Sequence, residues 1–443
     1  MVGMQRARSS LSTPVGRGFF LVAAATLCFG FALSANQNIV SNFFEDDLGL
    51  SGPQFGYITA IREIPGFLLI FVTALFYRLS LPHLTAGAFI LLAIGYGLFG
   101  TATSFWTVAP WVIISSMGYH TFLQTQYALA MSLTTENKTG GILGRLSSIN
   151  QAGALLAMAV VFLGFRFDFL TFRSTFVLCG ILALVAAAAI VRFPHMRDGE
   201  VHERSGRREA IVLRRDYRYY YGLSLLDGGR QQIFFSFGLW VLVDHYGLGV
   251  PAISAILLTV TTLSMLTGPR IGRLIDQHGE NRILATVNAG YVVALLGYGL
   301  VDNVIVAVAC YVVYSFIFPL SGMGAATYLR KISAADDLAP SLAMGLTMQH
   351  AAAVVVPIAT GFVLNYVGYQ IPFIVAIGFA LLALPVTRRL SPPDQKSERR
   401  RREDAARAVG LAPSPSPPRG AAKRGPRGAI VPPQGTAAAA TEE

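Results

Sequence analysis

The sequence predicts an all-α integral membrane protein with twelve transmembrane helices arranged as two six-helix, pseudo-symmetric halves. Of its 443 residues, 53% are hydrophobic and only 13% are charged, whereas an ordinary soluble domain has about 25% charged residues. The apolar residues form runs of about 20, the length that an α-helix needs to cross a bilayer. This composition excludes soluble enzymes, nucleic-acid-binding domains and secreted disulfide scaffolds.

Each predicted span follows one apolar run, and the polar segments between the runs are short. The spans cover residues 18–44, 53–77, 82–101, 105–134, 140–165, 172–193, 217–243, 251–272, 282–301, 303–329, 340–366 and 370–388. They form an N-terminal bundle over 18–193 and a C-terminal bundle over 217–388. A polar loop over 194–216 joins the two bundles.

The polar ends of the chain and the central loop predict the orientation. A segment over 1–17 precedes the first span, and an arginine- and proline-rich tail over 389–443 is expected to be disordered. Lys and Arg concentrate in these segments and in 194–216, so both termini are expected in the cytoplasm. An even number of spans requires the same. We therefore expect a monomeric multi-pass protein of the plasma (inner) membrane, with lipid but no nucleic acid as a partner.

An internal repeat relates the two halves. Residues 46–53 (DDLGLSGP) and 244–251 (DHYGLGVP) share an aspartate, a Gly-Leu pair and a proline at an offset of 198 residues. Further along, 145–147 (RLS) corresponds to 345–347 (GLT) before spans five and eleven. Two halves with the same orientation are a parallel repeat about an axis along the membrane normal.

With this repeat, the sequence resembles the major facilitator superfamily over about residues 18–388. The loop after span eight is similar to the family's loop motif through Gly272, Asp276, Gly279 and Arg282. The resemblance implies a charge-paired latch between helices in one state of an alternating-access cycle. The equivalent loop of the first half, 74–79, lacks both the glycine and the aspartate. Span five also lacks the glycine-proline signature of the family's drug/proton antiporters.

Four charged residues lie well inside predicted spans, where charge is costly and indicates a cavity or a partner. Asp227 and Arg230 are three residues apart and share one helix face. They either neutralise each other or border a cavity in which Arg230 meets an anionic group of the substrate. Glu63 is a candidate proton-binding carboxylate, or it is held by Arg62, Arg230 or another basic group.

Polar residues without a full charge, together with two histidines, add to the candidate site. By the resemblance, spans one, four, seven and ten line a central cavity, and span eleven flanks it. The candidates on these spans are Asn36, Gln37, His120, Gln124, Gln231, Tyr314, Gln349 and His350. The two histidines can titrate near neutral pH, or they can be bonded to carbonyls in helix interfaces.

Together these features predict a secondary transporter, not an enzyme, that moves a small organic solute by alternating access. Arg62 and Arg230 favour an anionic or zwitterionic solute. No cofactor or metal site is expected, and no GxxxxGK[ST] loop is present, so the energy would come from a gradient, with proton symport as the hypothesis.

Two alternatives stay open. One is an exporter of amphipathic or drug-like compounds, which 29 Phe and 17 Tyr would suit; the other is a non-transporting receptor or scaffold whose basic tail is its output.

Overall fold

The computed structural model describes residues 13–75, 79–133, 139–194, 213–278, 280–390 and 396–408. Residues up to Ser397 belong to one compact unit. Helix α16 (Glu398–Ala408) belongs to a second unit, which is described by itself. Over the described ranges the regular structure is helical, and no strand occurs.

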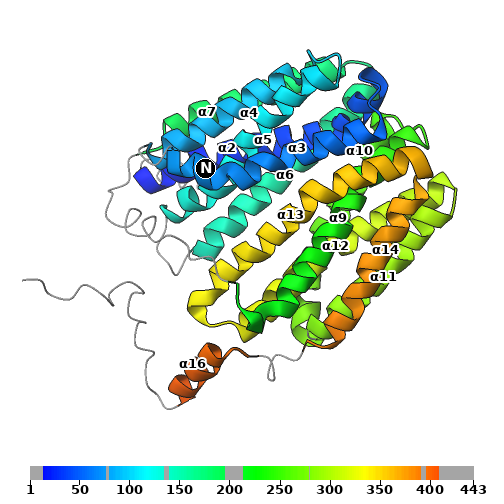
Figure 1. Ribbon diagram of the computed structural model, residues 1–443. Coiled ribbons are helices and arrows are strands. Elements are labelled where there is room, and N and C mark those ends of the chain that lie inside the picture. Colours follow the sequence, from blue (N-terminus) through cyan, green and yellow to red (C-terminus); the bar gives the residue numbers. More distant parts are fainter. Residues whose placement is uncertain are drawn as a thin grey trace, which may run out of the picture. The chain divides into compact units, whose positions relative to one another are not determined.

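Twelve helices of at least 19 residues make up the described part of the first unit. The N-terminal half contains α2 (Pro14–Asn42), α3 (Gly52–Leu75), α4 (Leu81–Phe99), α5 (Phe105–Met131), α6 (Thr139–Arg166) and α7 (Phe172–Val191). The C-terminal half contains α9 (Arg218–Asp244), α10 (Val250–His278), α11 (Glu280–Leu300), α12 (Val304–Ile332), α13 (Ala335–Val367) and α14 (Gln370–Arg388). Figure 1 shows the two halves as two groups of helices, with α3 beside α13 and α10 beside α6.

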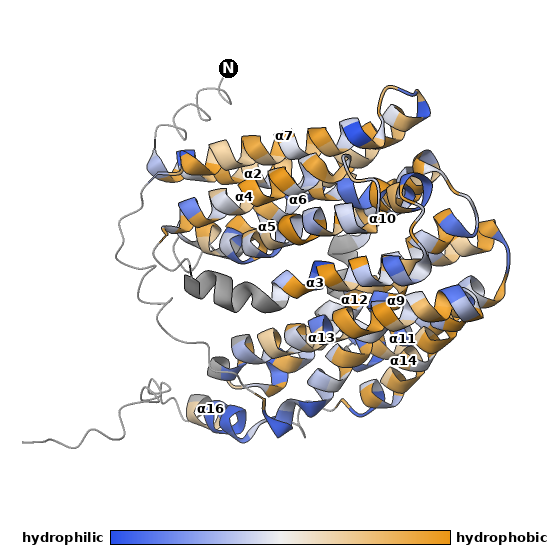
Figure 2. Ribbon diagram, turned by 45° about the horizontal axis from the view of Figure 1, so that its top comes forward, coloured by the Kyte–Doolittle hydropathy of each residue, from blue (hydrophilic) through white to orange (hydrophobic). Residues whose placement is uncertain are grey.

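The helices have the length and the surface of membrane spans. Among the described residues, nine helices are long and apolar enough to cross a bilayer. The other three long helices are α3, α5 and α9, which carry most of the charged and histidine candidates. Figure 2 shows predominantly hydrophobic ribbons. Large apolar side chains are exposed on α4, α7, α11 and α14, as expected of helices that face lipid. These features confirm the predicted fold class.

The observed helices differ from the predicted spans mainly in length. Helix α10 continues to His278, beyond the expected end at residue 272, and α13 begins at Ala335 rather than at 340. A helix does not have to end where its apolar run ends, because backbone hydrogen bonds can continue into the polar interface. Hydropathy therefore locates the membrane-embedded part of each helix and not its ends.

The internal repeat appears as two identical turns. Three backbone N–H groups, those of residues 48, 49 and 50, donate to the carbonyls of 43, 45 and 44 after α2. After α9 the residues displaced by 198 positions, 246, 247 and 248, donate to 241, 243 and 242. Gly49 and Gly247 have φ of 55° and 65° in these turns, a conformation that favours glycine. The shared Gly-Leu pair is thus the signal that ends the first helix of each half.

The two halves touch closely at the end of the bundle where these turns lie, which we call the turn end. The α3 and α13 backbones approach so closely that a Cβ on Gly52 would lie 2.8 Å from the carbonyl oxygen of Gly361. A Cβ on Gly56 would lie 2.5 Å from the carbonyl oxygen of Pro357. Phe55 packs against Trp240 of α9 in a tilted ring pair, with 4.3 Å between the ring centroids.

Hydrogen bonds add to this contact. The Asn42 side chain donates to the Leu248 carbonyl (3.0 Å), and the Ser254 hydroxyl donates to Asn38 Oδ1 (2.9 Å). Each bond joins one half to the other. At the turn end the halves are therefore held by close backbone packing, an aromatic ring contact and hydrogen bonds.

The start of the tail differs from the expected disorder after residue 389. The Leu390 carbonyl accepts a hydrogen bond from Asn281, and the Ser397 N–H donates to the Ile332 carbonyl (3.0 Å). Helix α16 then forms over Glu398–Ala408, where acidic and arginine side chains pair three or four residues apart. Such pairs stabilise helices, and the expectation of disorder counted only the arginines. The remainder, 391–395 and 409–443, lies outside the described residues.

The substitution Gly56→Leu tests the close packing of α3 on α13. A leucine there must push the Pro357 carbonyl away, and overpacking of this kind costs about 1–3 kcal/mol. We expect a lower melting temperature for the purified protein in detergent. Gly87→Leu in α4 is the control, since nothing lies within 4 Å of a Cβ at that position. Equal melting of the two variants would contradict the packing described here.

Candidate functional site

Glu63 lies near the middle of α3, about 16 Å along the helix from its first residue. The side chain is buried between three helices, and the whole residue is 8% exposed. One carboxylate oxygen, Oε1, accepts from the Arg62 guanidinium (3.2 and 3.3 Å), and the other, Oε2, lies 3.2 Å from His350 Nδ1 of α13. Glu63 is thus bonded to a residue of each half.

His120 of α5 completes this group. Its ring lies 5.8 Å from the His350 ring, centroid to centroid. Glu63, His120 and His350 each offer a ligand atom, and these atoms all lie within 4.8 Å of one another. We call these three residues the central triad. The triad takes two members from the N-terminal half and one from the C-terminal half.

Arg62 differs from the triad in its exposure. Its side chain is 49% exposed, although it lies next to Glu63 at the middle of the helix. Its backbone carbonyl accepts a hydrogen bond from the Ser116 hydroxyl of α5, which ties α3 to α5 at this depth. A half-exposed arginine at mid-depth is expected to face a water-filled space, because a guanidinium in lipid is costly.

A second group of charges lies within the C-terminal half. Arg230 is 1% exposed, and its guanidinium donates to Asp227 Oδ1 (2.8 Å) and to the Tyr314 hydroxyl. It also lies on the Tyr291 ring, 3.5 Å from the centroid. Asp227 accepts a further bond from Ser321. We call these five residues the arginine cluster.

The arginine cluster satisfies its own charges. Arg230 is paired with a carboxylate, a phenol and an aromatic face, all from α9, α11 and α12. This geometry corresponds to the alternative in which Asp227 and Arg230 neutralise each other. The helices that carry the cluster and the triad are in close contact, since a Cβ on Gly228 of α9 would lie 2.8 Å from the Gln349 backbone of α13.

The other polar candidates do not converge on one point. Asn36 is buried in α2, and its Nδ2 atom has no hydrogen-bond partner among the described residues. Gln37 and Gln124 are exposed, whereas Gln231 and Gln349 are half-buried. The structure therefore brings six of the twelve predicted site residues into two clusters, with Arg62 at the edge of the triad. It distributes the other five along four helices.

The predicted latch is only partly described. Gly272 and Asp276 lie on the α10 backbone, but their side chains are outside the described part of the chain, as is Gly279 entirely. Arg282 is exposed near the start of α11. The latch remains an expectation from the sequence.

Three residues that contact members of the two clusters or Arg62 were not among the sequence candidates. Tyr291 and Ser321 complete the shell around Arg230 and Asp227, and Ser116 bonds both Arg62 and His120. Tyrosine and serine are common in membrane helices, so their presence in a span carries no signal. Only the buried charges next to them could have indicated that these partners were needed.

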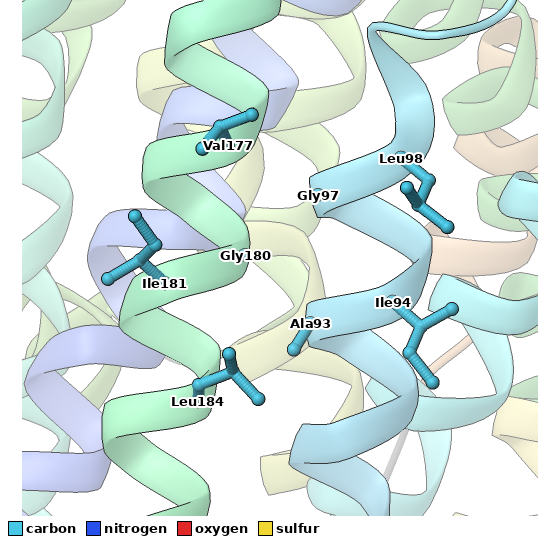
Figure 3. A pocket seen from close by; sticks show the side chains of 8 residues that line it. All are labelled: Ala93, Ile94, Gly97, Leu98, Val177, Gly180, Ile181 and Leu184. Atoms are coloured by element: carbon cyan, nitrogen blue, oxygen red, sulfur yellow. The ribbon is translucent and has the colours of Figure 1, made fainter.

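A surface groove between α4 and α7 is a different kind of feature (Figure 3). Its walls come from Ile94, Leu98, Ile181 and Leu184, and Gly97 faces Gly180 at its base. The side chains that line it are apolar. A groove of this type suits a lipid chain, and it offers no polar side chain to orient a solute.

Two six-helix halves that meet around buried charges at mid-depth are an arrangement typical of membrane transporters. The sequence matches the model of the Major Facilitator Superfamily over residues 22–328 and again over 220–432. The chain therefore belongs to the Major Facilitator Superfamily. No curated protein matches it.

Solved structures of the same fold are transporters. A point mutant of the nucleoside transporter NupG has a TM-score of 0.69 and 16% identity, covering 84% of this chain and 98% of its own. A D-xylose–proton symporter has a TM-score of 0.66 and 14% identity, covering 87% and 100%. A bacterial homolog of the human lysosomal transporter Spinster, inward-facing and occupied, has a TM-score of 0.65 and 12% identity, covering 86% and 98%.

The substitution Asp227→Asn tests the arginine cluster. It leaves the Arg230 charge buried without its carboxylate, and breaking a buried pair costs about 3–5 kcal/mol. We expect Asp227→Asn and Arg230→Met each to lower the melting temperature. The double variant should recover much of the loss, because no buried charge remains unpaired. Additive losses in the double variant would show that the two residues do not act as a pair.

Proposed function

We propose that this chain is a gradient-driven transporter of a small organic solute with an anionic or zwitterionic group, and that a proton is the coupling ion. The observation that carries the proposal is the contact of Glu63 with His350. It joins the two halves at the depth where a solute would cross, beside the half-exposed Arg62. Alternating access requires such a contact to form in one state and to break in another.

The proposed solute site begins at Arg62. Arg230 already has an acidic partner and is almost fully buried, whereas 49% of the Arg62 side chain is exposed. An anionic group on the solute could therefore pair with Arg62 in place of Glu63. The buried amide of Asn36, whose Nδ2 lacks a partner in the described structure, supplies a further donor on the N-terminal half.

The close contact of the two halves at the turn end supports a proposal for the conformational state of the transporter. The positive-inside distribution supports a cytoplasmic position for both termini, and the turn end would then face outward. The contacts at Gly52, Gly56 and Phe55 then close the outer side, and the state would be inward-facing. The likeness to the inward-facing Spinster homolog supports this view.

Proton coupling draws support from the fold and from the energy source. A solved neighbour is titled a D-xylose–proton symporter, and the sequence has no ATP-binding loop. The direction of transport would be import if solute and proton move together. An exporter of amphipathic compounds would instead exchange the compound for a proton that moves inward down its gradient.

Uptake into proteoliposomes tests the proposal. A ligand is first found by thermal shift of the purified protein against metabolite classes, and its labelled form is then used in transport. We expect an acidic outside to accelerate uptake several-fold. We also expect Arg62→Gln to raise KM by about tenfold, the effect of losing about 1.4 kcal/mol of ion pairing, with the maximal rate less affected.

The matched control is Arg166→Gln, a basic residue at the end of α6 and away from the central triad. It should leave KM unchanged. An uptake rate that does not change with the pH gradient would show that the proton is not the coupling ion. A KM that is the same in Arg62→Gln and in the wild type would contradict the proposed contact between Arg62 and an anionic group. A ligand that raises the melting temperature of the protein but is not taken up would favour a receptor.

A further inference from the structure

The central triad has the donor set of a transition-metal site. Glu63, His120 and His350 supply one carboxylate and two imidazoles, and their ligand atoms lie within 4.8 Å of one another. Two histidines and one glutamate, with a fourth position left open, are a known ligand set for zinc in proteins. The three residues are separated by 57 and 230 positions (120 − 63 and 350 − 120), so no local spacing in the sequence reveals them.

The spacing of two donors already suits a metal ion. Zinc bonds to histidine nitrogen and carboxylate oxygen measure about 2.0–2.2 Å, so donors in a tetrahedral site lie roughly 3.4 Å apart. His350 Nδ1 and Glu63 Oε2 are separated by 3.2 Å. The third donor, from His120, lies within 4.8 Å of the other two and has to approach them by at most about 1.4 Å, which a side-chain rotation can supply.

A hydrogen bond at one ring nitrogen orients His120, as is usual for a metal ligand. Its Nδ1 lies 3.0 Å from the Ser116 carbonyl oxygen, which can only accept, so this nitrogen carries the hydrogen. The other ring nitrogen, Nε2, then has its lone pair free and faces α3, where a Cβ on Gly66 would lie only 2.9 Å away. Metal-binding histidines usually donate their second ring N–H to a carbonyl or carboxylate in this way.

The surroundings of the triad exclude water on one side. Glu63 and His120 are 8% and 5% exposed, whereas the His350 side chain is 27% exposed. An ion could thus enter from the His350 side. The guanidinium of Arg62, 3.2 Å from Glu63 Oε1, opposes a cation. Because half of the Arg62 side chain is exposed, it can leave Glu63 when an ion arrives.

We propose that Glu63, His120 and His350 bind a divalent transition-metal ion of the zinc type, which bridges the two halves at mid-depth. Nitrogen donors select Zn²⁺, Co²⁺ or Ni²⁺ over Mg²⁺ and Ca²⁺, which prefer oxygen ligands. The ion binds all three residues only when α13 lies against α3 and α5. By linkage, the bound ion stabilises the state in which these helices are in contact and opposes their separation.

Binding is measured on the full chain in detergent after removal of any polyhistidine tag. Isothermal titration with Zn²⁺ should show one ion per chain, and Co²⁺ should give the visible absorption of a site with nitrogen ligands. We expect His120→Ala, His350→Ala and Glu63→Gln each to weaken Zn²⁺ binding more than tenfold, since each removes a ligand. Zn²⁺ should also raise the melting temperature of the wild type, whereas Mg²⁺ should not.

His83→Ala and His245→Ala are the matched controls, because both histidines lie outside the triad. They should leave Zn²⁺ affinity unchanged. His350→Gln, which keeps the side-chain volume, covers the case in which His350→Ala fails to fold. Zn²⁺ affinity that is the same in the wild type and in the folded His350 variant would overturn the proposal. The binding measurement requires no transport, so its outcome is independent of the proposed function.

Discussion

The close approach of α3 and α13 is the interaction on which the site depends. Gly52 and Gly56 on one helix meet Gly361 and Pro357 on the other with backbone against backbone. Side chains larger than glycine at positions 52, 56 and 361 would separate the helices. Because the backbones touch near the turn end, His350 lies within hydrogen-bond distance of Glu63 further along the same pair of helices. The backbone packing at these three glycines and Pro357 and the electrostatics of the central triad are therefore parts of one contact.

The two clusters of buried charge have different consequences. The arginine cluster draws all its members from the C-terminal half, so its bonds would be preserved if the halves moved as rigid bodies. The triad draws members from both halves, so it must come apart if the halves separate. A charge buried in a membrane needs a partner in each state. If the halves separated, Glu63 would keep Arg62 on its own helix and would lose His350, so its surroundings would depend on the conformation.

Local pattern predicts a large part of this structure. The apolar runs predict the helices, and the repeat of aspartate, Gly-Leu and proline predicts two turns that prove identical in their hydrogen bonds. The spacing of three between Asp227 and Arg230 predicts that they can pair, because such residues share a helix face. Contacts between distant segments follow no such rule. Glu63 and His350 are 287 residues apart, and nothing in either segment indicates the other. Helix α16 was not predicted, because the interpretation of the tail emphasised its run of arginines and not the acidic residues that pair with them.

In the proposed transport cycle the halves touch at the turn end in one state and separate there in another. A direct measurement is the distance between spin labels at Trp106 on α5 and Tyr366 on α13, which are 80% and 75% exposed. The labels would be introduced as cysteines, after replacement of Cys28, Cys179 and Cys310. Alternating access predicts one distance in the resting protein and a second, longer one when solute and a proton gradient are supplied. A single distance that is unchanged under all these conditions would contradict it.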